Sequence, residues 1–140
     1  MNIILLVPSG AAASAISQLS IEPDDEVVVV ASSQPDTGVR ALILSPALAS
    51  ATKRAERSLG GTALGRNVLR LTPLDAGRRF AGATRRNKAL RAEIAQADLI
   101  VVLERDGILA GWHALRRAAP EARAVYGIPA AKGLLASTRH

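Results

Sequence analysis

The stretch of this sequence best equipped for chemistry is Glu104-Arg105-Asp106, three adjacent charged residues that follow an apolar segment. Two carboxylates beside a guanidinium can hold the hydroxyl groups of a sugar, or act as a general acid and base. The plainer interpretation is that Asp106 caps the next helix while Glu104 and Arg105 pair with each other. Both interpretations stay open at this level, and no catalytic residue is identified.

A second candidate is the polar loop after the first apolar segment, from Pro8-Ser9-Gly10 to Ser14. It occupies the place of a phosphate-binding loop, where the backbone N–H groups that begin a helix favour an anion. The loop has one glycine where the G-x-G-x-x-G fingerprint has three, and the chain contains no Walker A pattern. We therefore expect either a phosphate or sugar contact here, or a Ser9 helix cap with Gly10 in a turn. A standard dinucleotide site is not expected.

These loops must be positioned by the elements around them, and apolar segments alternate with helical patterns along the whole chain. Strands are predicted for residues 3–7, 27–30, 67–72, 99–103 and 122–128, and residues 39–44 form a short strand or lead into a helix. Helices are predicted for residues 10–20, from Ser45-Pro46 to 59, 75–96, 108–119 (with Trp112 on the core face) and from 129 onward.

This alternation predicts an α/β fold, a three-layer Rossmann-like or flavodoxin-like sandwich with a mostly parallel sheet of about five strands. Residues 1–140 are expected to form one domain. Ligands of such sheets bind outside the carboxyl ends of the strands, at the switch point of strand order. That rule assembles a predicted ligand-binding set, whose members are Ser9, Gly10, Ser14, Ser32, Ser33, Glu104, Arg105, Asp106 and Gly127.

The composition excludes or disfavours disulfides, transition-metal sites, membrane spans and secretion. The chain has no cysteine and only two histidines, so neither a disulfide framework nor a transition-metal site is expected, and no cofactor is identified. No apolar run is long enough to span a bilayer. The first apolar stretch is short and lacks a preceding Lys or Arg, so we expect no secretory signal and a cytoplasmic protein.

The charge is unevenly distributed over a chain whose formal net charge is +6. Residues 53–91 hold eleven Lys and Arg against Glu56 and Asp75, a local net charge of +9. Arg78, Arg85 and Lys88 fall on one side of the helix predicted for 75–96, and an anionic partner there, an acidic protein or a nucleic acid, is the alternative to solvated helix faces. Aromatic residues make up only 2% of the chain, so stacking platforms for nucleic acid are nearly absent. The alanine-rich helices also allow a homodimer.

The segment Ala97-Asp98-Leu99-Ile100-Val101-Val102-Leu103-Glu104-Arg105-Asp106, followed by Trp112 and Val125-Tyr126-Gly127, resembles the N-terminal Rossmann-like half of GT-B glycosyltransferases. The resemblance covers about a quarter of the chain. In that family this half binds the acceptor, and a second, C-terminal half binds the nucleotide-sugar. The resemblance therefore implies a glycosyltransferase-like domain lacking its second half. The function expected from the sequence is the binding of a phosphorylated, sugar-type or nucleotide-type small molecule at the strand ends, and the alternative is a basic interaction module.

Overall fold

A computed structural model describes every residue of the chain except 46–48, 60, 73 and 140. Its centre is one sheet of five strands, β1 (Asn2–Leu6), β2 (Glu26–Ala31), β3 (Ala41–Ile43), β4 (Leu99–Val102) and β5 (Arg123–Tyr126). Their order is β3-β2-β1-β4-β5, and every pairing is parallel. The predicted parallel α/β sandwich is confirmed, with the strand order of the Rossmann type.

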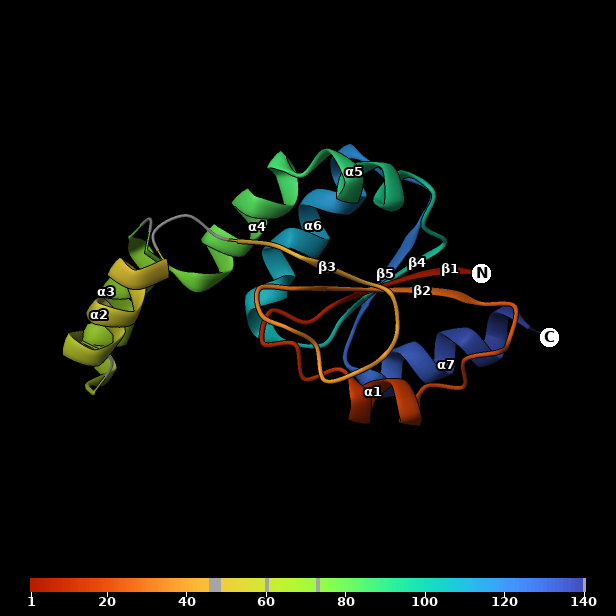
Figure 1. The fold of residues 1–140 in the computed structure, drawn as a ribbon, viewed down its shortest axis with the longest axis horizontal. Helices are drawn as coiled ribbons and strands as arrows, with labels where there is room; N and C mark the ends of the chain where they lie inside the picture. The colour runs from red at the N-terminus through yellow and green to blue at the C-terminus, as the bar shows by residue number, and fades with distance from the viewer. Residues whose placement is uncertain (46–48, 60, 73, 140) are drawn as a thin grey trace.

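Helices cover both faces of this sheet (Figure 1). One face carries α1 (Ala13–Gln18) and α7 (Ile128–Thr138), and the other carries α4 (Ala76–Arg86), α5 (Lys88–Ala95) and α6 (Ile108–Arg117). The short 3-10 helix η1 (Arg105–Gly107) leads directly into α6. The helices α2 (Ala49–Leu59) and α3 (Ala63–Leu71) pack against each other and lie to one side of the sheet.

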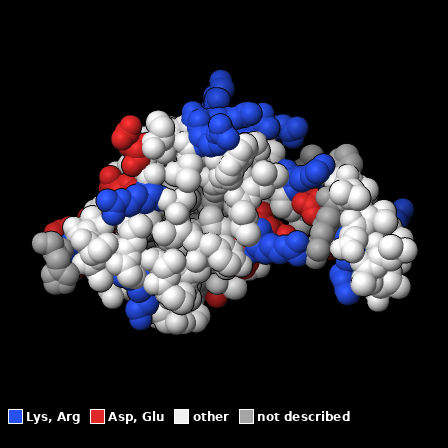
Figure 2. Space-filling view, turned by 180° about the vertical axis from the view of Figure 1, so that it is seen from behind, with Lys and Arg blue, Asp and Glu red and all other residues white. Residues whose placement is uncertain are grey.

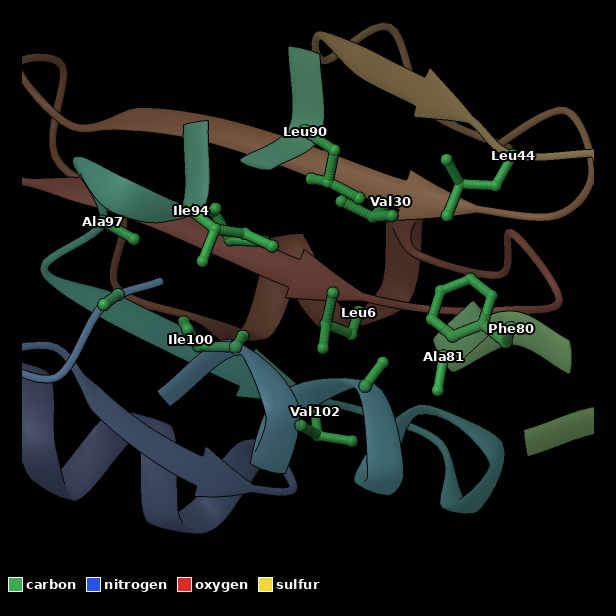
Figure 3. Packing of buried hydrophobic residues seen from close by; sticks show 14 residues of the cluster. Leu6, Val30, Leu44, Phe80, Ala81, Leu90, Ile94, Ala97, Ile100 and Val102 are labelled. Atoms are coloured by element: carbon green, nitrogen blue, oxygen red, sulfur yellow. The ribbon is translucent and has the colours of Figure 1, made fainter. Parts of the chain in front are cut away.

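The continuous apolar strands are explained by burial on both sides. In β1, Ile4 and Leu6 pack into the cluster under α4, α5 and α6, where Phe80 fills the space beside the sheet (Figure 3). Ile3 and Leu5 point the other way, into the cluster under α1 and α7. Each such side chain contributes about 1.5–3 kcal/mol relative to exposure. The sheet is therefore held from both faces, as parallel sheets require.

The strand predicted for residues 67–72 is wrong, because residues 67–71 belong to α3. Leu64, Val68 and Leu71 recur at helical spacing and remain largely exposed, at 77%, 48% and 78%. The weak alternation of apolar and polar residues that predicted a strand comes from this helical spacing of the apolar residues. The sheet position next to β2 is taken instead by β3 within the 39–44 segment, and the predicted helix start at Ser45-Pro46 falls at residues outside the described part.

The single helix predicted for residues 75–96 is also wrong. The backbone turns at Asn87, which ends α4 and begins α5 with a ψ of 110°. The Asn87 side chain accepts a hydrogen bond from the Leu90 backbone N–H at 2.9 Å. Asparagine side chains compete with helical backbone bonds in this way. As a result, Arg78 and Lys88 lie on two different helices.

Trp112 was predicted to face the core and instead is 49% exposed. The buried face of α6 is made of small residues, and a Cβ built on Gly111 would lie 2.7 Å from Cγ2 of Val102. The helix therefore approaches the sheet too closely for a large side chain at its inner face. Trp112 lies outside, with the Arg116 guanidinium 5.0 Å from its ring centroid.

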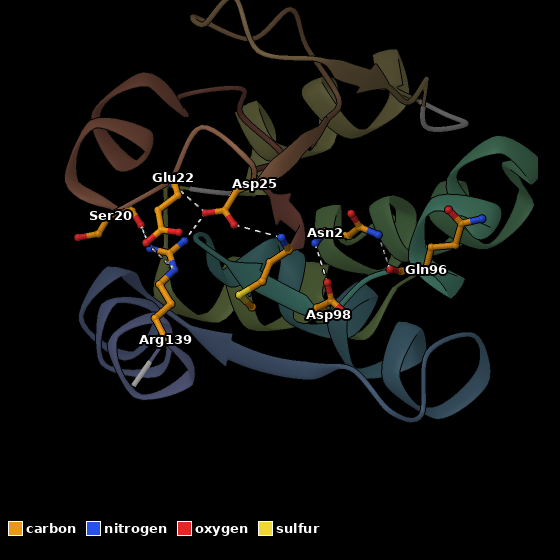
Figure 4. A network of polar contacts seen from close by, with 8 residues as sticks. Asn2, Ser20, Glu22, Asp25, Gln96, Asp98 and Arg139 are labelled. Atoms are coloured by element: carbon orange, nitrogen blue, oxygen red, sulfur yellow. Dashed lines mark hydrogen bonds and ion pairs between the residues drawn. The ribbon is translucent and has the colours of Figure 1, made fainter.

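The amino ends of the strands are closed by polar contacts (Figure 4). The N-terminal ammonium lies 3.2 Å from Asp25, whose other oxygen pairs with Arg139 at the end of α7. At the start of β1, the Asn2 backbone N–H donates to the Asp98 carboxylate at 2.7 Å, and the Asn2 side-chain amide donates to the Gln96 carbonyl at 2.9 Å. In the described part of the chain, no helix has the length and apolar character needed to cross a membrane.

Candidate functional site

The strand order reverses between β1 and β4, and an open crevice of about 590 Å³ lies at the carboxyl ends of the strands there. Its wall combines α1, the segment after β4 and the start of α7. The polar residues of this wall are Ser14, Gln18, Glu104 and Lys132, and Gly127 lines it through its backbone. Ala15, Leu103 and Ile128 supply apolar surface. Parallel α/β sheets bind their ligands at this place; the crevice is therefore the candidate site.

Glu104 joins the ends of two neighbouring strands. Its carboxylate accepts hydrogen bonds from the Ser9 backbone N–H, at 2.9 Å, and from the Ser9 hydroxyl. The Ser33 hydroxyl in turn donates to the Ser9 carbonyl oxygen, which extends the chain of contacts to the end of β2. The predicted gathering of Ser9, Ser33 and Glu104 is thus what the fold produces, whereas the expected pairing of Glu104 with Arg105 is replaced by the bonds to Ser9.

The start of α1 is occupied by a carboxylate from the same chain. The helix cap is Ala12, not Ser9, and it makes no side-chain cap bond. One oxygen of Asp36 accepts from the Ala12 and Ala13 N–H groups, at 2.7 and 2.8 Å. Gly10 has a φ of 85°, and its carbonyl accepts the Asp36 backbone N–H at 3.1 Å. The backbone N–H groups that we expected to bind a phosphate are therefore already bonded to Asp36.

The other predicted residues are divided among different places. Ser32 is half-buried, and its backbone N–H donates to the Pro8 carbonyl at 3.0 Å. Arg105 and Asp106 line a separate hollow of about 570 Å³, which they share with Asp75 and Glu56. Asp106 is not the cap of α6, because that position is Gly107 and η1 intervenes. Of the predicted set, the crevice itself gathers Ser14, Glu104 and Gly127.

Lys132 and Gln18 line the crevice and were not among the predicted residues. Gln18 donates to the Ser14 hydroxyl at 3.1 Å, and Lys132 is an exposed residue in the second turn of α7. Lys132 is the one Lys or Arg on the described wall of the crevice. The sequence signal that could have identified Lys132 is its position one helical turn after Gly127-Ile128-Pro129. A helix that begins at the carboxyl end of a strand has its first turns next to the ligand-binding site.

The basic block of residues 53–91 does not lie on one helix. Its described residues are spread over four helices, α2 to α5. Arg85 lies at the end of α4 beside α6, whereas Arg78 lies near the start of α4. Among the described residues, no three His, Asp or Glu side chains are placed to share a metal ion.

Comparison with known proteins adds no relative: no family model, curated protein or solved structure matches this chain. The likeness to the N-terminal half of GT-B glycosyltransferases therefore stays a prediction from the sequence.

Proposed function

We propose that this protein binds a small molecule carrying both hydroxyl groups and a negative charge, of the sugar-phosphate or nucleotide type, in the crevice between α1 and α7. The observation that carries the proposal is an open hollow at the strand-order switch between β1 and β4, with a carboxylate and an ammonium group on its wall. Ligands of parallel α/β sheets bind at such switch points.

Each polar residue of the crevice suits a different chemical group of such a ligand. The Lys132 ammonium binds the anionic group, because the α1 amides are already bonded to Asp36. Glu104 uses one lone pair of each oxygen for Ser9 and can accept sugar hydroxyls with those that remain. Ser14 and Gln18 supply further polar contacts, and Ala15 and Ile128 support an apolar ring face.

This ligand class agrees with the resemblance to the acceptor-binding half of GT-B glycosyltransferases. In that family the half that this chain resembles binds the acceptor, and the transfer reaction also needs the half that binds the nucleotide-sugar. The proposal therefore concerns binding, and it assigns no catalytic residue.

The test is a thermal-shift screen with glucose 6-phosphate, UDP and UDP-glucose, followed by titration calorimetry. A ligand at one hundred times its dissociation constant should raise the midpoint by roughly 9 °C for a chain of this size. Lys132→Ala should remove most of this shift, whereas Lys88→Ala, which removes an exposed lysine from α5 on the other face of the sheet, should leave it unchanged. A screen in which no compound moves the midpoint would overturn the proposal, and so would equal losses in the two variants.

A further inference from the structure

A second pocket lies on the other face of the sheet, between α4, α5 and α6. It has a volume of about 380 Å³, inside the range of small-molecule sites. Ile94, Ala110 and Ala114 form an apolar floor that belongs to the core cluster. The pocket shares no lining residue with the crevice between α1 and α7.

Four arginines surround this pocket, namely Arg85 and Arg86 from α4, Arg91 from α5 and Arg117 from α6. No Asp or Glu appears on its described wall. Within the described part of the chain, none of these four arginines takes part in an ion pair. Figure 2 shows Lys and Arg gathered over the helical layer that contains the pocket.

The helix ends explain only part of this arrangement. Arg85, Arg86 and Arg117 lie in the last turns of α4 and α6, where cations interact favourably with the helix dipole. Each helix end carries about half a negative charge, so two ends offset about one of the four positive charges. A net charge of about +3 is left around one small pocket. The four arginines are exposed, so water and salt weaken their mutual repulsion, and a bound anion would relieve what remains.

His113 adds a polar group that the protein itself leaves without a partner. It lines the pocket from α6, and its Nδ1 is buried and makes no hydrogen bond. Burial lowers the pKa of His113 below 6.5, and the charges of Arg117 and Arg85 lower it further. The imidazole is therefore neutral near pH 7, and because water does not reach Nδ1, the ring senses charge in the pocket without this atom touching a ligand.

We infer that this pocket binds a small phosphate compound with at least two negative charges. Guanidinium groups bind phosphate oxygens through paired N–H donors, which matches four arginines around one hollow. The apolar floor can hold the organic part of such a molecule. A small molecule fits better than a nucleic acid, because the pocket is confined by three helices and no exposed aromatic lines its described wall for base stacking.

The probe is pyrophosphate, with ADP as the organic counterpart, titrated by calorimetry into the Lys132→Ala protein so that the crevice between α1 and α7 does not contribute. The double variant Arg86→Gln/Arg117→Gln should weaken binding by about 100-fold, as expected for losing two charged hydrogen-bond donors. The control is Arg78→Gln/Arg123→Gln, which removes the same charge from exposed positions outside the pocket. It should change affinity by about twofold at most at physiological salt.

A second readout follows His113 directly and needs no change in the pocket. The chain has only one other imidazole, that of His140, so the His113 resonances can be assigned simply by NMR. Bound pyrophosphate should shift these resonances and raise the pKa of His113, because an anion stabilises the imidazolium.

Three results would overturn the inference. The first is that pyrophosphate and ADP fail to bind, or leave the His113 resonances unmoved at saturation. The second is an equal loss of affinity in the pocket variant and the control, which would mean nonspecific attraction. The third is that a single-stranded oligonucleotide binds more tightly than ADP and displaces it, which would make this surface a nucleic-acid interface. Since Lys132 is absent throughout, none of these results depends on the proposed function of the crevice.

Discussion

Replacing Asp36 by alanine tests whether the start of α1 depends on a carboxylate supplied by a distant loop. In the native protein one Asp36 oxygen binds the N–H groups of Ala12 and Ala13. The helix has only six residues, too few to be stable without tertiary support. We therefore expect Asp36→Ala to destabilise the protein and to loosen α1 in particular.

The magnitude follows from what each N–H group retains. The Ala12 N–H keeps a bond of 2.9 Å to the Gly10 carbonyl, and Ala13 is exposed, so water can reach its N–H. The cost is therefore that of losing a helix cap, about 1.5 kcal/mol including the interaction with the helix dipole. For a chain of this length that corresponds to a fall in Tm of roughly 5 °C.

The assay is urea unfolding followed by circular dichroism, with amide hydrogen exchange across α1. Asp36→Asn keeps an acceptor and loses the charge, so it should cost about 0.5 kcal/mol. Asp24→Ala removes an exposed carboxylate from the neighbouring acidic loop and should change stability by less than about 0.5 kcal/mol. If Asp36→Ala is no less stable than Asp24→Ala, the N–H groups at the start of α1 do not need Asp36. Our explanation of why these N–H groups are not available to a phosphate then fails.

Two further predictions concern packing and charge. Gly111→Ala should destabilise the protein by about 1–3 kcal/mol, because the new Cβ would lie 2.7 Å from the Val102 side chain. Gly133→Ala, in the middle of α7 where nothing lies within 4 Å of the new Cβ, should stabilise the protein by about 0.5–1 kcal/mol. Calorimetric Tm values that change in the same direction for both variants would contradict this. Burial alone would raise the pKa of Asp25, but the Glu22 N–H, the N-terminal ammonium and Arg139 outweigh it and lower this pKa below 3.8. The unfolded chain therefore binds the proton more tightly, and the stability that Asp25 contributes should be present above about pH 4 and lost as the pH falls through the lowered value. Urea midpoints of the native protein and Asp25→Asn should accordingly converge in acid, and a constant difference would refute the assignment.

The strands of the core could be predicted because their signal is local and strong. Ile3 to Val7, Val27 to Val30 and Leu99 to Val102 are continuous apolar runs, which only burial on both faces of a sheet explains. The errors arose where local signals compete. Residues 67–72 alternate weakly and also fit a helix, and Asn87 interrupts a helical pattern with a cap whose effect depends on the surrounding packing.

The candidate site was likewise predicted in part. The rule for parallel sheets brought Ser9 and Glu104 together correctly, since both follow apolar strands and the two strands are neighbours. The sequence is compatible with either the Rossmann-type or the flavodoxin-type strand order, and the pairing of β1 with β4 makes it the Rossmann type.

By itself, the pattern of apolar and polar residues determined the layers, the three central strands β1, β2 and β4 and the loops at their carboxyl ends, because burial acts on each segment separately. Tertiary structure alone decided that Asp36 closes the start of α1, that Lys132 enters the crevice, and that Arg117 joins Arg85 around a second pocket. These contacts join residues at least 23 positions apart, as the Ala13–Asp36 bond does. No local preference encodes such a contact, because it exists only once the helices have packed on the sheet.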